Sequence, residues 1–111
     1  MKTVMNSLMG LACVAMMSSP VWAGGDADAG KAKSQACASC HGADGNSPSP
    51  QFPNLAGQQR SYLLHALKAY KSGDRKNPLM AGMVAALTEE DMENLAAYFS
   101  AQSGLRDTAS D

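Results

Sequence analysis

The chain has 111 residues, with 9 Lys and Arg against 10 Asp and Glu, so its formal net charge at pH 7 is −1. This length is enough for one small domain, whose core is thin and often needs a covalent or cofactor staple. The near-neutral balance excludes the strongly basic surface of a nucleic-acid-binding protein, and no nucleic-acid partner is expected.

The first 23 residues have the pattern of a secretory signal peptide. Lys2 supplies the positive start, residues 4–17 are mostly apolar, and Val21-Trp22-Ala23 places small side chains at the −3 and −1 positions. We therefore predict cleavage after Ala23, which makes residues 1–23 a signal peptide and residues 24–111 the exported domain.

Two alternatives to a cleaved signal were considered. An uncleaved membrane anchor is disfavoured because the apolar run is short for a bilayer and is interrupted at Asn6 and Ser7, so no stable membrane insertion is expected. Lipidation at Cys13 is disfavoured because Gly10-Leu11-Ala12 is a poor match to the sequence that precedes a lipidated cysteine.

The mature sequence begins with a predicted helix from Asp26 to about Cys37. Asp26 is a good N-cap, and small residues fall on one face of this helix: Ala29, Ala32, Ala36 and Cys37. Gly30 costs about 1 kcal/mol in a helix relative to Ala. It indicates either a weak helix or a point where another helix crosses closely.

The motif Cys37-Ala38-Ser39-Cys40-His41 follows, and its Cys-x-x-Cys-His spacing is that of covalent haem c attachment. Each thiol can form a thioether with one haem vinyl group, and His41 can bind the iron. The alternatives are a thioredoxin-type thiol pair, which lacks its βαβ context here, and half of a zinc site, which lacks a second ligand pair.

Residues 42–58 are predicted to be a long loop because Gly and Pro interrupt them repeatedly. A ligating histidine needs an acceptor for its second ring nitrogen, and the carbonyl of Pro53 is the candidate. Leu55 is expected to pack on the haem. The alternative for this stretch is an ordinary surface turn.

The rest of the chain predicts two helices joined by a second loop at 77–83. The first runs from Arg60 to Ser72, and the second opens at Thr88 and ends near Gly104. The second is expected to bury one stripe of side chains: Met92, Leu95, Ala96 and Phe99. His65 lies off the apolar stripe of the first helix, and as the only other histidine it is an alternative second ligand of the iron. No strand is apparent.

Charged side chains gather at the end of the first of these predicted helices, including residues just beyond it, and at the start of the second. The basic ones are Lys68, Lys71, Arg75 and Lys76, and the acidic ones are Glu89, Glu90, Asp91 and Glu93. Such groups are usually solvated surface. The alternative is a dipole that steers the docking of a partner.

With these residues in view, the chain resembles the small class I c-type cytochromes of bacteria. The likeness is strongest to a single-haem relative of one cytochrome c4 domain, in the c553/c554-like group. It rests on the haem motif and on segments that span nearly all of residues 24–111: Asp44-Gly45-Asn46, Phe52 to Gln58, Tyr62-Leu63, Met80 to Met83, and Leu95 to Phe99. In that family, a glycine and an aromatic meet where the terminal helices cross, and Gly30 and Tyr98 match them.

The resemblance implies an all-α fold with three main helices and long loops around one covalently attached haem. It implies a monomeric periplasmic electron carrier without a catalytic site, exchanging electrons with membrane respiratory or photosynthetic complexes, or with a periplasmic dehydrogenase or oxidase. The family pattern places the second iron ligand at the first methionine of Met-x-Gly-Met, which favours Met80 over Met83. The alternatives are a haem c subunit of a flavocytochrome or sulfur-oxidising complex, and an enzyme or gas sensor with an open haem position.

Overall fold

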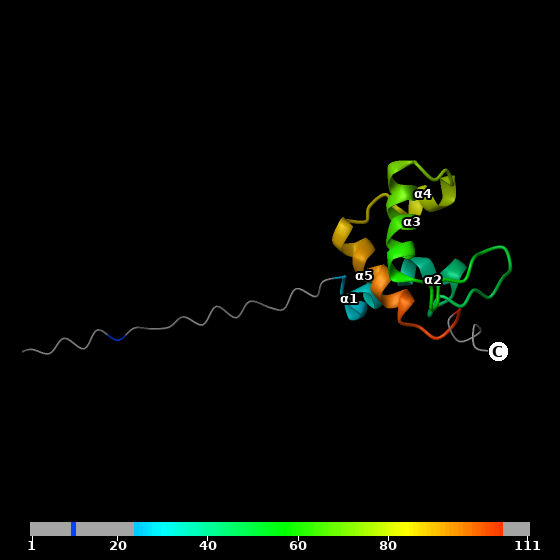
Figure 1. Ribbon diagram of the computed structural model, residues 1–111. Coiled ribbons are helices and arrows are strands. Elements are labelled where there is room, and N and C mark those ends of the chain that lie inside the picture. Colours follow the sequence, from blue (N-terminus) through cyan, green and yellow to red (C-terminus); the bar gives the residue numbers. More distant parts are fainter. Residues whose placement is uncertain (1–9, 11–23, 106–111) are drawn as a thin grey trace, which may run out of the picture.

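The computed structural model describes Gly10 and residues 24–105 (Figure 1). The predicted cleavage site after Ala23 lies outside the described residues. Within them the secondary structure is entirely helical, without strands, as the sequence predicts. The helices are α1 (Ala27–Lys33), α2 (Gln35–His41), α3 (Arg60–Ser72), α4 (Pro78–Val84) and α5 (Glu89–Ser100).

The N-terminal segment forms two short helices, where the sequence predicted one. The Asp26 side chain caps α1 as expected, but the helix breaks at Ser34, which is buried. The Ser34 hydroxyl donates to the Lys31 carbonyl at 2.7 Å, a local bond that competes with helix continuation. The expected common face of small residues is therefore wrong, and both Ala32 and Ala36 are exposed.

Gly30 marks the place where α1 crosses α5, which confirms the close-crossing interpretation. The residue is buried, and a Cβ atom there would overlap the Asn94 carbonyl and lie 2.8 Å from Tyr98 Cβ. Asn94 is also buried, and its Oδ1 accepts the Asp26 N–H at 2.8 Å. The absence of a side chain at position 30 thus lets the first and last helices touch backbone to backbone.

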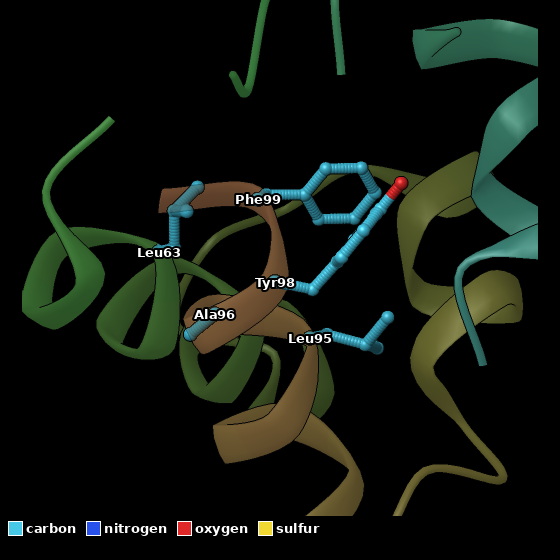
Figure 2. Close-up of a cluster of buried hydrophobic side chains, with 5 residues drawn as sticks. All are labelled: Leu63, Leu95, Ala96, Tyr98 and Phe99. Carbon is cyan, nitrogen blue, oxygen red and sulfur yellow. The ribbon is translucent and has the colours of Figure 1, made fainter. Parts of the chain in front are cut away.

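The core lies where α3 and α1 pack against α5. Figure 2 shows its main cluster, in which the Tyr98 and Phe99 rings extend side by side from α5 with centroids 5.1 Å apart. The cluster consists of Leu63, Leu95, Ala96, Tyr98 and Phe99. Met92 is buried as well, so the predicted apolar stripe of the last helix is confirmed.

The segment predicted as a second loop is the helix α4, which packs against α3 (Figure 1). Asn77 is its N-cap, and its side chain accepts the N–H groups of Leu79 and Met80 at 3.1 Å each. Pro78 occupies the first turn, where its fixed φ favours a helix and its missing N–H costs nothing. The prediction of a loop at 77–83 is wrong, because Asn-Pro suits a helix start as well as a turn and α4 packs against α3.

The start and end of α3 and the start of α5 follow the prediction, whereas α5 ends at Ser100 and not near Gly104 as predicted. α3 stops at Gly73, whose φ of 86° is left-handed and favours glycine. α5 opens with a capping box in which Thr88 Oγ1 accepts the Asp91 N–H at 3.1 Å and an Asp91 carboxylate oxygen accepts the Thr88 N–H at 3.0 Å. Across the described residues, we find no helix with the length and apolarity that a membrane span requires.

Candidate haem-attachment site

The two thiols lie one helical turn apart on α2, so they face the same side of that helix. Both are free cysteines and both are half-buried. Cys37 packs against the core cluster, and burial, followed by the neighbouring Cys40, raises the pKa of its thiol. A pair of reduced thiols on one face at this spacing has the arrangement needed to bond the two vinyl groups of a haem.

His41 is the last residue of α2 and is 7% exposed. Its Nδ1 lies 2.8 Å from the carbonyl oxygen of Pro53. Because a carbonyl oxygen can only accept, Nδ1 carries the proton and donates it, which leaves the Nε2 lone pair available to a metal. The hydrogen bond predicted between these residues is present, while ligation of iron by His41 stays a prediction.

The loop that carries Pro53 has no regular secondary structure, as predicted, and is fastened at both ends. At its start, the Tyr98 hydroxyl donates to the Ala43 carbonyl at 2.8 Å. At its end, the Gly57 N–H donates to the Phe99 carbonyl at 3.0 Å. The Gly45 carbonyl accepts the Leu55 N–H at 2.7 Å and closes the loop on itself. The two ends of the loop that carries the His41 acceptor are therefore fastened to α5.

Two apolar side chains of this loop lie close to the site. Leu55 is half-buried and packs against the core cluster. The ring of Phe52 meets the His41 ring edge-on, with centroids 6.2 Å apart and planes at 68°. This contact was not predicted, although an aromatic residue immediately before the Pro53 acceptor was a readable signal. Contact of Leu55 with a haem stays a prediction.

The candidate methionine ligands come from a different element, α4, which packs against α3. Met80 is half-buried on α4, and Met83 on the same helix is 40% exposed. His65 is exposed on α3. The preference for Met80 as a second axial ligand agrees with its greater burial and stays a prediction.

The residues present fit a haem c. The site offers two free thiols and an imidazole whose tautomer is already set for metal binding, with Phe52 and Leu55 as apolar neighbours. Soft thioether and imidazole donors are those that haem iron takes as axial ligands.

The charged groups predicted on the last two long helices are neighbours, not separate poles. Lys68 Nζ lies 2.7 Å from a Glu89 carboxylate oxygen, which raises the pKa of Lys68 and lowers that of Glu89. The Lys71 ammonium donates to the Leu87 carbonyl, and Arg75 lies 4.8 Å from the centre of the Tyr70 ring. Two of the four basic side chains, those of Lys68 and Lys71, thus bond to Glu89 and Leu87 where α3 meets the start of α5. These bonds argue against a charge dipole that steers the docking of a partner, which stays a hypothesis.

Comparison with known proteins agrees with this site. The sequence profile of the cytochrome c family matches residues 27–103. The chain belongs to the cytochrome c family. As a member, it carries covalently bound haem c with its iron.

The relatives of this cytochrome differ in length. The crystal structure of reduced recombinant cytochrome c4 from Pseudomonas stutzeri is 48% identical, with a TM-score of 0.69 over 72% of this chain and 47% of that chain. Cytochrome c-554(548) of Halomonas halodenitrificans is 46% identical over 81 residues, or 70% of this chain and 98% of that protein. A thiosulfate dehydrogenase electron acceptor of Stutzerimonas stutzeri is 43% identical over 60% of this chain and 31% of that protein. The chain spans less than half the length of the cytochrome c4 proteins it matches.

Proposed function

We propose that the protein is a periplasmic electron carrier that holds one electron at a time on its haem c. The observation that carries the proposal is the buried His41 imidazole, which donates from Nδ1 to the Pro53 carbonyl at 2.8 Å and keeps Nε2 for iron. An imidazole fixed by the fold on the helix that bears both thiols favours a rigid site, and rigidity suits electron transfer.

The residue roles follow from the donor set. Cys37 and Cys40 would hold the haem through thioether bonds, and His41 and Met80 would be the ligands of its iron. When bound, the haem would supply one-electron chemistry at its iron. Leu55 would lie beside the haem, and Pro53 sets the tautomer of His41. Because the protein would supply both of these iron ligands, we propose no catalytic residue.

Export through the N-terminal signal is part of the same proposal. The mature protein then comprises residues 24–111 and acts in the periplasm. Mass spectrometry of the purified protein should give the mass of these residues plus one haem that survives acid extraction. A mass that retains residues 1–23, or a haem that extracts freely, would contradict it.

The partners are redox proteins: membrane respiratory or photosynthetic complexes, or a periplasmic dehydrogenase or oxidase. The relative named as a thiosulfate dehydrogenase electron acceptor supports a dehydrogenase as partner. A second candidate function is that of a haem c subunit in a flavocytochrome or sulfur-oxidising complex. Gentle purification separates the two functions, because a carrier is recovered as a free monomer and a subunit is recovered with its enzyme.

The test of the carrier function is a redox titration of the purified holoprotein, with its optical spectrum recorded at each potential. We expect one reversible one-electron wave and, in the oxidised protein, a weak sulfur-to-iron charge-transfer band. Met80→Ala should abolish that band, lower the potential and admit external ligands, because the iron loses a thioether ligand. The matched control, Met83→Ala on the same helix, should leave all three properties near wild type.

The opposite behaviour of the two variants would move the ligand to Met83. If neither variant loses the band, His65 or another distal ligand replaces Met80. A five-coordinate ferrous spectrum that binds carbon monoxide readily in the wild type would refute the carrier and favour an enzyme or gas sensor.

A further inference from the structure

Asn54 closes the loop that presents the Pro53 carbonyl to His41. Its side-chain Oδ1 accepts the Ser47 N–H at 2.7 Å, across seven residues of chain. Pro48 and Pro50 lie between them and have no N–H to donate. One backbone–backbone bond lies inside this interval, from the Phe52 N–H to the Ser49 carbonyl at 3.2 Å, and the bonds from the Leu55 and Ala56 N–H groups to the Gly45 carbonyl enclose it at 2.7 and 3.1 Å. The Asn54 side chain is therefore a cross-link between the two sides of the tip of this loop.

Ser47, the partner of Asn54, lies beside the haem motif. Its hydroxyl has one proton, for which the Ser49 carbonyl oxygen at 2.7 Å is the nearer acceptor, and the Cys40 carbonyl oxygen lies in contact at 3.3 Å. The contacts thus form a closed circuit. It runs from the Cys40 carbonyl to Ser47, from the Ser47 N–H to Asn54, and through the Pro53–Asn54 peptide back to the His41 ring.

We infer that Asn54 is a positioning residue for the His41 imidazole, acting through the Pro53 carbonyl. The carbonyl that accepts from Nδ1 belongs to the same peptide unit as the Asn54 nitrogen. Any rotation of that unit moves the acceptor away from His41, and the Asn54–Ser47 bond resists this rotation. A firm acceptor at Nδ1 makes an imidazole a more basic metal ligand. Asn54 thereby tunes the haem iron without touching it.

The inference rests on the proposed function, because it requires that His41 bind the iron. Its test is exchange of the His41 Nδ1–H with solvent, measured by NMR on the reduced holoprotein, together with the reduction potential. In Asn54→Ala, loss of about one neutral hydrogen bond should raise the exchange rate about fivefold. The potential should also rise, because a weaker Nδ1 hydrogen bond makes the ligand less electron-rich.

Two further variants separate positioning from general loosening of the loop. Asn54→Asp keeps an oxygen acceptor for the Ser47 N–H and should restore slow exchange. Asn46→Ala is the matched control, because Asn46 lies in the same loop but its side chain donates to Asp44 and to the Ser103 carbonyl. It should leave both the exchange rate and the potential near wild type. Equal changes in the Asn46 and Asn54 variants would overturn the inference.

The wild-type holoprotein supplies a test that does not depend on any variant folding. If one circuit holds both groups, the Ser47 N–H and the His41 Nδ1–H should be protected from exchange together. A Ser47 N–H that exchanges as in an open chain, beside a protected His41 proton, would refute the inference. A His41 ring without the NMR shifts of an iron ligand would instead refute the proposed function, whatever Asn54 does.

Discussion

Replacing Gly30 by alanine sets two effects of opposite sign against each other at the α1–α5 crossing. Alanine is the better helix former, so local propensity predicts a gain of about 1 kcal/mol. The added Cβ, however, would overlap the backbone carbonyl of Asn94 and lie 2.8 Å from Tyr98 Cβ. A backbone carbonyl in the middle of α5 cannot turn aside, so the two helices must separate.

The steric effect should win. Overpacking a well-packed contact costs about 1–3 kcal/mol, and here the contact is backbone against backbone, which favours the upper end. Separation of the helices also strains the bond from the Asp26 N–H to buried Asn94, which spans the same junction. After the propensity gain is subtracted, we expect a net loss of about 2 kcal/mol, or a fall in Tm of about 10 °C for a domain of this size.

Thermal and guanidinium unfolding of the holoprotein measure this loss. The matched control is the reverse exchange on the same helix, Ala32→Gly, at an exposed position. It should cost about 1 kcal/mol through propensity alone. A Gly30→Ala protein as stable as the wild type, or more stable, would show that helix propensity outweighs the crossing and would refute the reasoning.

The remaining predictions concern other bonds of α5. Tyr98→Phe removes the hydroxyl that donates to the Ala43 carbonyl and should cost about 1 kcal/mol in guanidinium unfolding, and an unchanged midpoint would show that this bond is replaced by water. The pKa of Asp91 is held below its ordinary 3.8, first by the Thr88 backbone N–H and more weakly by Lys33. Because the folded pKa is the lower one, Asp91 stabilises the fold above pH 3.8, and this contribution is lost as the pH falls through the lowered pKa. Asp91→Asn should therefore lower the free energy of unfolding at pH 7. The difference in the free energy of unfolding between this variant and the wild type should become smaller near pH 2, and a difference that stays constant with pH would contradict the assignment.

The parts of the fold that could be predicted are those in which a single local sequence pattern determines the structure. Thr88 and Asp91 form a capping box from their spacing alone, and the apolar stripe from Met92 to Phe99 has one face to bury. In the site, the Cys-x-x-Cys-His spacing and the need of a ligating His41 for an acceptor were enough to indicate Pro53.

The parts that could not be predicted depend on competing local bonds. A serine hydroxyl can bond to the backbone at a helix break or can lie within a continuous helix, and in this fold the buried Ser34 hydroxyl bonds to the Lys31 carbonyl at the break. Asn77 and Pro78 suit a turn or a helix start equally, and the packing of α4 against α3 selects the helix. The Asn54–Ser47 bond was also out of reach, because a loop without periodicity gives no register from which to pair its side chains.

The α1–α5 crossing also sets the order in which the domain can form. The crossing joins the first and last helices of the described chain, and Tyr98 and Phe99 of the core cluster come from the last of them. Cys37 packs against this cluster, so the part of the core that covers it is incomplete until α5 is in place. We therefore expect both thiols to be open to chemistry until then, because contacts between residues far apart in sequence form slowly. This delay gives an attachment reaction time to act before tertiary structure shields Cys37.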